Sequence, residues 1–590
     1  MISAQSVSLV AQFFAQAEKF GDRPFLWAKK DDAWQPTSWR QAAEQVRSLA
    51  RGLKRLGLRP GDRVVLVAEN RPEWLIADHA IMAAGGITVP AYTTNGVNDH
   101  LHVLTDSGAG IVIVSNAVLA AKLLPAVLRA PAVTHVIAME PLRHGQSDGF
   151  QLHQWGTVVA QGAAHKDVAL AEPQRRDIAC LIYTSGTGGA PKGVMLSHGA
   201  ILHNCEGAHD ALTGLGLGND IFLSFLPLSH SYEHTAGQFV PIALGAQIYY
   251  AEGIDALAGN MLEVRPTVMT AVPRLYETMQ NRIIRGVERA APRARKLFLR
   301  TLALGRKRME GSLTLLERLE DAVLTLLVRR KVRARFGGRL KAMVSGGAPL
   351  NPEVGIFFTA LGLCILQGYG QTESAPVISV NRPGKVKIAT VGPIIKDTQV
   401  MLADDGEILV RGELVMKGYW NQPQATADAL RDGWLHTGDI GTFDDDGYLT
   451  ITDRKKDIIV NSGGDNISPQ RVEGFLTLEP EIAQAMVIGD KRPYLVALLV
   501  PDETTLAAWA KEQGKATDLN ALRNDPALKE YLGAAITRVN ANLSVIERVR
   551  HYIVADEPFT TANGEMTPTL KIRRHVLKAR YGERLEALYR

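Results

Sequence analysis

The sequence predicts an α/β protein with a large N-terminal domain, residues 1–453, and a small α+β C-terminal domain, residues 454–590. Three observations support this prediction. Short apolar runs alternate with helical periodicity in the first half of the chain, as in a largely parallel sheet covered by helices. Several predicted strands end in loops of small residues. A compact charged segment, residues 453–457, then precedes a stretch with strands and helices of its own.

Composition sets the broad class. The chain has 590 residues, 46% hydrophobic and 22% charged, which is ordinary for globular proteins and too long for one core. The net charge of +5 permits anionic ligands or membrane contact and demands neither. Three cysteines without metal-ligand spacing favour a reducing compartment, so we expect the cytoplasm. Residues 1–19 indicate an amphipathic helix and not a signal peptide, and no run reaches the ~18 apolar residues of a membrane span.

The alternating region runs from about residue 61 to residue 139. Strands are predicted over residues 64–67, 87–89 and 111–114, and helices over residues 73–84 and 98–106. Residues 144–166 are polar and contain glycine, so we expect a connection there.

A glycine-rich stretch, residues 184–193, follows the apolar strand predicted over residues 178–183. Its glycines, hydroxyls and single lysine, Lys192, are the mixture that binds phosphate, although a flexible surface loop is the alternative. It is neither a Walker A loop nor a dinucleotide fingerprint, because Pro191 precedes the lysine and Gly193 follows it. A helix can begin at Ser197–His198.

Two further strands, over residues 342–344 and 364–366, also end in small-residue loops, residues 345–349 and 367–373. Ligands in open α/β sheets bind beyond the carboxyl ends of strands, so these loops and the glycine-rich stretch share one cleft if their strands are neighbours. A helix is predicted to start at Asn351–Pro352.

The segment 227–234 follows a strand predicted over residues 221–226 and carries His230 and His234, four residues apart. That spacing suits a metal pair on a helix, but no third ligand is evident nearby and Pro227 interrupts the segment. A capping or pocket-lining histidine is the favoured interpretation.

A basic region begins near residue 280 and extends to about residue 335. Its first part faces few acids in sequence, chiefly Glu288, and its second part carries apolar residues at helical spacing. The cations are Arg282, Arg285, Arg289, Arg293, Arg295, Lys296, Arg300, Arg306, Lys307 and Arg308, and the later apolar residues are Leu315, Leu316, Leu319, Val323, Leu326 and Leu327. The pair of helices can lie on anionic lipid, or be a solvated hairpin whose leucines pack on the main domain. Nucleic acid is not expected as a partner, because no aromatic platform accompanies the cations.

The remaining segments complete the two-part organisation. A small β-rich subdomain is expected around a strand at residues 407–412, followed by a Thr-Gly-Asp turn at residues 437–439. In the C-terminal part, Ser468 caps a helix, strands cover residues 485–488 and 495–500, and a helix covers residues 506–511. Residues 566–574 form a loop that opens a last helix.

Five motifs follow one another along the chain, namely residues 184–193, 345–349, 369–373, 437–439 and 453–456, with Lys571 near the end. In their order and spacing they resemble the AMP-forming acyl-CoA synthetases of the adenylate-forming superfamily. The amino-acid sequence of residues 367–373 and the presence of a helical insertion at about residues 280–335 are most similar to those of the bacterial long-chain fatty acid–CoA ligases. The resemblance implies an N-terminal domain of stacked α/β sheets with a small β subdomain, and a mobile C-terminal domain. One departure is Gly188, where the family usually has threonine, so the loop lacks one hydroxyl.

The resemblance also implies the reaction. A fatty acid and ATP give acyl-AMP and pyrophosphate, and CoA then takes the acyl group and releases AMP. ATP and CoA are substrates, and Mg2+ accompanies the ATP. Cations must offset the repulsion between carboxylate and triphosphate, so catalysis consists of positioning and electrostatic stabilisation.

Site residues follow from the resemblance position by position. The β- and γ-phosphates would be held by Ser185, Gly186, Thr187, Gly188, Gly189 and Lys192. Mg2+ would be bound by Glu373 with Thr184. The remaining nucleotide contacts would be Thr372 at the α-phosphate, Gly347, Gln367, Gly368 and Tyr369 at the adenine site, and Asp439 with Arg454 at the ribose. Lys571 would reach the α-phosphate and the carboxylate, His230 would position the acyl group, and Lys456 would be the domain hinge.

Two alternatives stay open at this point. One is a related enzyme, either a fatty acyl-AMP ligase that serves a carrier protein or an aryl-CoA ligase. The other is a nucleotide-binding, membrane-associated protein without turnover, which Gly188 and the basic region suggest.

Overall fold

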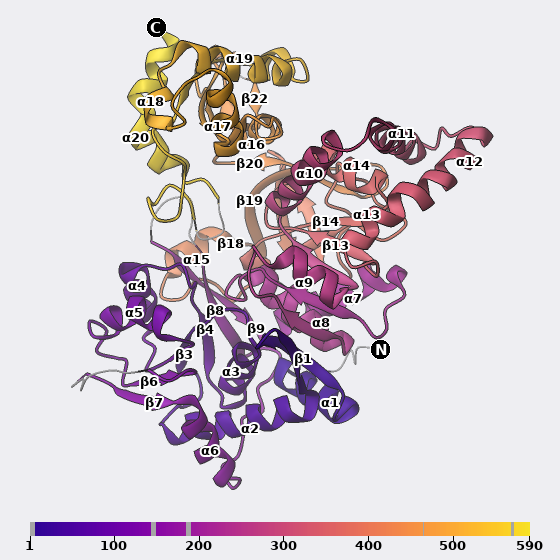
Figure 1. Ribbon diagram of the computed structural model, residues 1–590. Helices are drawn as coiled ribbons and strands as arrows, with labels where there is room; N and C mark the ends of the chain where they lie inside the picture. The colour runs from indigo at the N-terminus through magenta and orange to yellow at the C-terminus, as the bar shows by residue number, and fades with distance from the viewer. Residues whose placement is uncertain (1–5, 143–148, 185–189, 464, 568–570) are drawn as a thin grey trace.

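The computed structural model describes residues 6–142, 149–184, 190–463, 465–567 and 571–590 (Figure 1). It confirms the predicted α/β class, with two large sheets, a small β subdomain and a separate α+β unit at the C-terminal end. In Figure 1 the C-terminal unit lies at one end of the molecule, above the larger part.

The first sheet contains the alternating region. Its order is β7 (Gln151–Gln154), β6 (His135–Ala138), β5 (Ile111–Val114), β3 (Arg63–Val67), β4 (Ile87–Pro90), β8 (Ile178–Thr184) and β9 (Lys192–Ser197). All neighbours are parallel except β8 and β9, which form an antiparallel pair. The connecting helices are α3 (Pro72–Ala83), α4 (Val97–Ser107) and α5 (Ala117–Val127). The parallel order follows from the crossover helices, as predicted.

The second sheet has eight strands. Its order is β15 (Val377–Val380), β14 (Ile365–Gly370), β13 (Ala342–Ser345), β12 (Val268–Ala271), β10 (Ile221–Ser224), β11 (Gln247–Tyr250), β1 (Pro24–Lys30) and β2 (Ala33–Ser38). The interior pairs are parallel and the two edge pairs are antiparallel. This sheet therefore brings the carboxyl ends of β13 and β14 together at one edge.

One hydrophobic core joins the two sheets. It contains side chains of β3 and β8 from the first sheet, of β10 and β11 from the second, and of the helices packed with them, among them Trp74 and Phe239. These helices are α3 together with α1 (Leu9–Phe20), α2 (Trp39–Arg55), α7 (His198–Leu212), α8 (Val240–Leu244) and the π-helix η2 (Glu233–Phe239). The predicted N-terminal amphipathic helix is α1, and its apolar face is buried in this core.

The prediction that residues 144–166 form a connection is wrong for the described part of this stretch. The described part of this stretch contains β7 and the helix α6 (Trp155–Ala164). α6 packs closely on α2, because a Cβ at Gly162 would lie 1.8 Å from the carbonyl oxygen of Ser48. Small residues, which read as a loop signal in the sequence, here permit close contact between two helices.

The small β subdomain is an antiparallel sheet of β16 (Gln399–Leu402), β17 (Glu407–Arg411), β18 (Leu430–Arg431), β19 (Trp434–Phe443) and β20 (Leu449–Arg454), with the helix α15 (Pro423–Ala429). The Thr-Gly-Asp motif was expected in an exposed turn, but it lies inside β19, with Thr437 and Asp439 buried. Gly438, with φ of 70°, permits the irregular backbone at that point.

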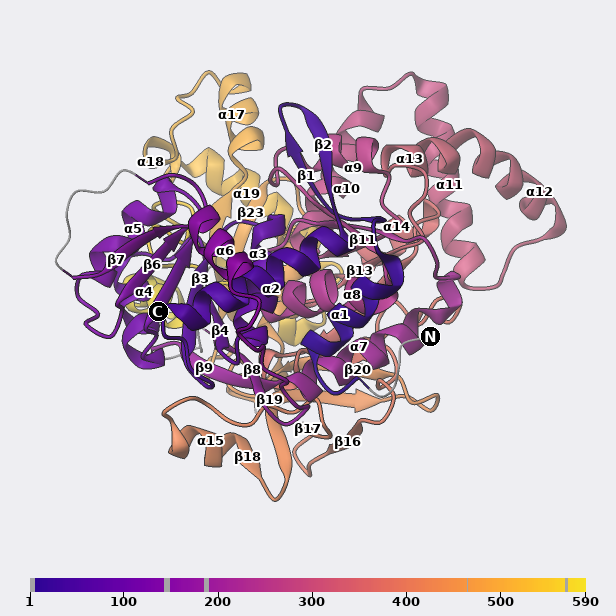
Figure 2. The ribbon, with the colours of Figure 1, turned by 90° about the horizontal axis from the view of Figure 1, so that it is seen from below.

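The insertion consists of helices packed beside the second sheet. They are α10 (Pro273–Glu288), α11 (Pro292–Met309), α12 (Leu315–Leu324), the π-helix η3 (Thr325–Arg329) and α13 (Arg330–Arg335), while α9 (Leu257–Val264) precedes the insertion and α14 (Pro352–Ala360) follows it. In both Figure 1 and Figure 2, α11 and α12 project from the body of the molecule. Phe298 of α11 is buried against Phe357 of α14, which anchors the hairpin to the domain.

The C-terminal unit has its own cores. Its sheet is β23 (Ile482–Ile488), β24 (Leu495–Pro501) and β25 (Val549–Val554), and a short ribbon is formed by β21 (Ile459–Val460) and β22 (Asn466–Ile467). The helices are α16 (Pro469–Leu476), α17 (Glu503–Glu512), α18 (Leu519–Leu522), α19 (Pro526–Asn540) and α20 (Arg574–Glu586). Two apolar clusters are built only from residues 459–585. The boundary at residue 454 stays a prediction.

Candidate active site

The glycine-rich stretch connects β8 to β9 as an antiparallel hairpin. Thr184 and Lys192 are register partners at its base. The tip residues Ser185, Gly186, Thr187, Gly188 and Gly189 lie outside the described residues. Ser197 caps α7, as predicted, but β9 separates the loop from that helix, so the helix start does not face the loop directly.

Two of the three predicted loops belong to neighbouring strands, but the strand predicted to end at residue 366 continues as β14 to Gly370, so only residues 371–373 of the second loop follow it. β13 and β14 are parallel, and Ser345 pairs with Gln367. Gly347 has φ of 81°, a conformation that favours glycine, just beyond β13. Gly368 lies within β14, where a Cβ would approach the carbonyl oxygen of Ser379 to 3.1 Å. The glycine-rich hairpin belongs to the other sheet, and β9 lies beside the turn η4 (Thr372–Ser374) that follows β14.

Thr372 is held by a residue that sequence reasoning missed. The hydroxyls of Ser231 and Thr372 lie 2.9 Å apart, and both side chains are buried. Ser231 precedes η2, and a π-helix is a frequent feature of functional sites. The irregular helix therefore links the histidine-containing segment to the loop after β14.

Asp439 connects three predicted site residues. Its Oδ2 accepts a hydrogen bond of 2.7 Å from Tyr369, and its Oδ1 lies 3.2 Å from Nε of Arg454. Asp439 and Arg454 are register partners on β19 and β20. The arrangement presents a buried carboxylate, only 4% exposed, next to an aromatic ring and a guanidinium. Such a carboxylate can accept hydrogen bonds from vicinal hydroxyls.

Lys571 approaches this cluster from the C-terminal unit. Its side chain still reaches solvent, but the surrounding protein and the nearby Arg454 lower the pKa of its ammonium to about 8, against the opposite influence of Asp439 and Glu373. Lysine, arginine and two carboxylates from distant parts of the chain thus act on one another electrostatically.

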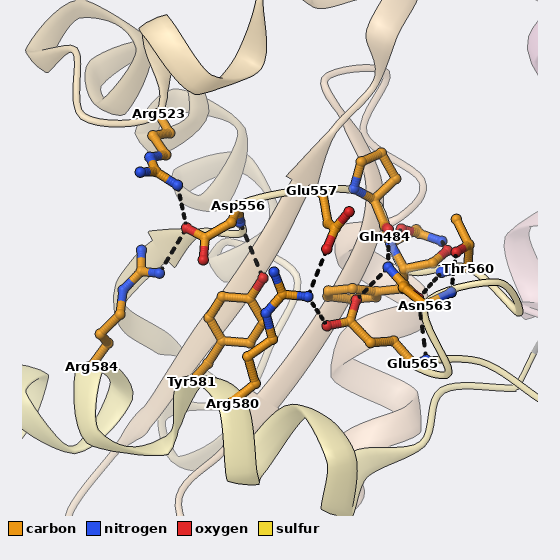
Figure 3. A network of polar contacts seen from close by, with 12 residues as sticks. Gln484, Arg523, Asp556, Glu557, Thr560, Asn563, Glu565, Arg580, Tyr581 and Arg584 are labelled. Carbon is orange, nitrogen blue, oxygen red and sulfur yellow. Dashed lines mark hydrogen bonds and ion pairs between the residues drawn. The ribbon is translucent and has the colours of Figure 1, made fainter.

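Two backbone hydrogen bonds to Thr567 hold Lys571 in place. Its backbone N–H donates to the hydroxyl of Thr567, and its carbonyl oxygen accepts from the Thr567 N–H. Upstream, the buried Glu565 accepts hydrogen bonds from Arg580 and Asn563, within the network that Figure 3 shows. The final helix therefore holds the base of the loop in place.

His230 and His234 have different surroundings. Burial and the charge of Lys571 lower the pKa of His230 to about 4, so its imidazole is neutral near pH 7. His234 is buried and its Nε2 lies 2.9 Å from Oδ2 of Asp78 on α3. The two rings therefore do not act as a pair, and His230 is the one beside Lys571.

The residues present are compatible with Mg2+. No cluster of three or more His, Cys, Asp or Glu that could hold a metal occurs in the part of the chain that the structure describes. Mg2+ usually takes one or two carboxylates together with substrate phosphates and water, so a dedicated cage is not required. The half-buried carboxylate of Glu373 accepts a hydrogen bond at Oε1 from Tyr419, and no other described residue donates to it, so Oε2 can serve a cation.

Two predicted residues stand apart from these contacts. Lys456 is exposed just beyond β20, and Gln367 contributes its carbonyl oxygen to Asn381. Tyr419, by contrast, was not anticipated although it touches Glu373. The sequence signal that could have identified Tyr419 is a glycine followed by two aromatic residues, Gly418-Tyr419-Trp420. Gly418 has φ of 130°, a conformation that favours glycine.

Comparisons with known proteins agree with this arrangement. The profile described as AMP-binding enzyme matches residues 13–420, and that described as AMP-binding enzyme C-terminal domain matches residues 456–590. The chain is 36% identical to the long-chain-fatty-acid–CoA ligase FadD15 of Mycobacterium tuberculosis over 95% of this chain and 93% of the relative. It is 30% identical to long-chain-fatty-acid–CoA ligase 1 of Cavia porcellus, over 96% and 84% respectively.

Among solved structures, the chain resembles the A domain of carboxylic acid reductase from Segniliparus rugosus in complex with AMP and a co-purified carboxylic acid. The TM-score is 0.77 at 22% identity, with 100% of this chain and 95% of that chain covered. This likeness concerns the fold, and it confirms the expected arrangement of a large N-terminal domain and a smaller C-terminal domain.

Proposed function

The chain belongs to the AMP-binding enzyme family, and from that premise we propose that it is a long-chain fatty acid–CoA ligase. It joins a fatty acid to the α-phosphate of ATP with release of pyrophosphate, and then transfers the acyl group from acyl-AMP to the thiol of CoA with release of AMP. The names of its relatives support the substrate class.

One observation carries the chemical part of the proposal: Lys571 of the C-terminal unit lies within electrostatic range of His230, Asp439 and Glu373. The first half-reaction brings an anionic carboxylate to an anionic triphosphate. A positioned ammonium group offsets that repulsion, and its loss from a site of this kind typically costs about 3 kcal/mol in the transition state. Neutral His230 can donate a hydrogen bond to the carboxylate and orient it, as a positioning residue and not as a base.

The other residues divide between the nucleotide groups. Lys192 and the hairpin tip hold the β- and γ-phosphates, and Thr372, fixed by Ser231, contacts the α-phosphate. Tyr369, Gly347, Gln367 and Gly368 line the adenine site, and Asp439 with Arg454 binds the ribose. When bound, Mg2+ supplies charge neutralisation at the phosphates, and Glu373 with Thr184 would hold it.

The second half-reaction requires a different arrangement of the C-terminal unit. We infer that Lys571, which faces Asp439 and Glu373 in this arrangement, must withdraw before the thiol of CoA can reach the acyl-AMP. We therefore infer that the unit rotates about the exposed segment at Lys456 after adenylation, because a hinge can absorb the change at a few backbone dihedrals. Separate apolar cores in the two parts are compatible with such a motion.

A pyrophosphate-release assay with Mg2+ and ATP tests the function across acids from acetate to oleate, with and without CoA. Release that depends on a long-chain acid, and a thioester product when CoA is present, are expected. A product that forms only with a carrier protein indicates a fatty acyl-AMP ligase, and a preference for aromatic acids indicates an aryl-CoA ligase. Absence of pyrophosphate with every acid leaves the non-catalytic alternative and overturns the proposal.

We also propose that the insertion contacts the anionic inner face of a membrane from the cytoplasmic side. The alternative, a solvated hairpin whose leucines pack on the main domain, holds for Phe298 and Leu304 of α11, which are buried. It does not hold for six later aliphatic residues, which are 46–80% exposed, namely Leu315, Leu316, Leu319, Val323, Leu326 and Leu327. Their spacing places them on one face of α12 and η3. Figure 2 shows α12 at the periphery. None of the described helices is long and apolar enough to cross a membrane.

The charges of the insertion are only partly available for lipid. Contrary to the sequence expectation, half of the ten cations over residues 282–308 pair with acids from elsewhere, for example Arg300 with Glu320 and Arg306 with Glu353. The start of α11 and α13 carry cations that form no ion pair with any residue the structure describes, namely Arg293, Arg295, Lys296, Arg330, Lys331 and Arg333. These cations and the leucines of α12 are the proposed lipid-contact residues.

A further inference from the structure

Tyr419 contacts two predicted phosphate-site residues at once. Its hydroxyl donates a hydrogen bond of 2.8 Å to Oε1 of Glu373, and Nζ of Lys192 lies 4.8 Å from the centroid of its ring. Glu373 follows β14 of the second sheet, and Lys192 begins β9 of the first. The side chain of Tyr419 therefore connects the two sheets at the base of the glycine-rich hairpin, where Lys192 lies.

The backbone fixes the position of Tyr419 from both sides. The N–H of Trp420 donates to the carbonyl oxygen of Gly193 at 2.7 Å, and the N–H of Met416 donates to that of Glu373 at 2.9 Å. Tyr419 also forms a β-bridge with Val194. Residues 416–420 are thus held between β9 and η4 by backbone hydrogen bonds, so the ring of Tyr419 reaches its position without a ligand.

The chemistry of the two contacts is complementary. The phenol of Tyr419 is a neutral hydrogen-bond donor, and its hydroxyl donates to the carboxylate of Glu373. A hydrogen bond to Oε1 limits rotation of the carboxylate and leaves Oε2 for a cation. The face of the ring attracts the ammonium of Lys192 and restricts where it lies.

We propose that Tyr419 is a positioning residue for the Mg2+ complex of ATP, which orients the carboxylate of Glu373 through its hydroxyl and the ammonium of Lys192 through its ring. This inference rests on the proposed function only in requiring ATP as the ligand. Among the residues that the structure describes, the hydroxyl of Tyr419 contacts Glu373 and its ring contacts Lys192, so Tyr419 would act through these two side chains and not directly on the reacting carboxylate or the α-phosphate.

The two contacts can be removed separately. Tyr419→Phe keeps the ring and removes the hydroxyl, whereas Tyr419→Leu removes both. Tyr448 offers a matched control, because its hydroxyl donates to the carbonyl oxygen of Lys385 at 2.7 Å and Lys387 lies 4.5 Å from its ring centroid, among residues that are not part of the predicted site. Tyr448→Phe and Tyr448→Leu therefore remove the same pair of contacts elsewhere.

ATP binding is measured by titration calorimetry in Mg2+ and in EDTA, without fatty acid or CoA. For Tyr419→Phe we expect about a tenfold loss of the affinity that Mg2+ adds, as for other residues that orient a metal ligand, and unchanged affinity in EDTA. Tyr419→Leu should in addition weaken binding in EDTA by about fivefold. Both Tyr448 variants should bind ATP as the wild type does in either buffer.

Equal affinities of Tyr419→Phe and Tyr448→Phe in Mg2+ would overturn the inference. So would equal losses in Mg2+ and EDTA accompanied by a lower Tm, which indicate a structural role, or a wild type whose ATP affinity does not rise with Mg2+. The titration needs no turnover, so a wild type that binds Mg2+ and ATP but releases no pyrophosphate would refute the proposed function and leave this inference standing.

Discussion

The guanidinium of Arg285 lies 3.5 Å from Oδ1 of Asp502, and this ion pair joins α10 of the insertion to the start of α17 in the C-terminal unit. Asn351 also donates to the carbonyl oxygen of Gly474 on α16. Both contacts are present in the arrangement in which Lys571 lies near Asp439 and Glu373, so under the proposed function they stabilise the arrangement for adenylation.

Asp502→Asn should weaken that arrangement without unfolding the unit. Asp502 caps α17 through the N–H of Thr505, and asparagine caps equally well. A partly exposed ion pair contributes up to ~1 kcal/mol, so we expect at most about a fivefold fall in the adenylation rate. Transfer of the acyl group from supplied acyl-AMP to CoA should not fall.

Pyrophosphate release and thioester formation, measured separately by stopped-flow, check this expectation. Glu353→Gln is the control, because it breaks an ion pair of the insertion, with Arg306, that does not involve the C-terminal unit. Equal effects of the two substitutions on adenylation would contradict a role for the Arg285–Asp502 pair.

Lys571→Ala should separate the two half-reactions. Acyl-AMP formation should fall by at least ~100-fold, since a positioned charge is lost, whereas supplied acyl-AMP and CoA should still give thioester. Lys578→Ala, which removes another exposed lysine from α20, should leave both rates unchanged. Equal losses in both half-reactions of Lys571→Ala would refute the rotation of the C-terminal unit.

The pH dependence of adenylation should report Lys571. The charged ammonium is the useful form, and its pKa is about 8 in the folded protein, below its ordinary value of 10.5. The kcat/KM for ATP should therefore be high below that pKa and decline as pH rises through it. Lys571→Arg should remove this decline, because a guanidinium stays charged, even if its geometry lowers the maximum rate. Profiles between about pH 6 and pH 10 that are identical for both proteins would assign the decline to another group.

Removing the apolar face of α12 should weaken lipid binding. Leu316→Ser with Leu319→Ser should lower co-sedimentation with vesicles that contain anionic lipid, as should the replacement of Arg293, Arg295 and Lys296 by glutamine. Val118→Ser with Leu128→Ser is the control, because both residues are exposed elsewhere. Co-sedimentation equal to that of the control would count against the membrane contact.

Glu233 should make stability depend on pH. It is fully buried, and burial raises its pKa from 4.5 to about 7 despite hydrogen bonds from Ser224 and Thr270. Because the folded state binds the proton more tightly than the unfolded state, stability should fall as pH rises between these two values. The difference of about 2.5 pKa units corresponds to ~3 kcal/mol.

Glu233→Gln should remove this dependence, because an amide can serve both hydroxyls without a charge. The Tm difference between variant and wild type, followed from about pH 5 to pH 8, should therefore move in favour of the variant. Glu288→Gln, at an exposed position, should show no such trend. A constant difference across the range would show that Glu233 is charged or neutral throughout.

The sequence alone indicated the α/β class and the order of the motifs. Alternation of apolar runs and helical periods is a local property, and it correctly predicted strands such as β3 and β5 and the largely parallel sheet to which they belong. Ser197, Asn351 and Ser468 also cap the helices expected after them, because a cap depends on a few adjacent residues. The motif resemblance then supplied the family.

Only the tertiary structure decided what meets across the two sheets and the two parts of the chain. Tyr419 with Glu373, Ser231 with Thr372, and the acids that neutralise half of the basic stretch are separated by ten or more residues in sequence, so no local pattern predicts them. The sequence also could not predict whether the leucines of α12 are exposed. Helical spacing determines which residues share a face, and only the packing determines whether that face is covered.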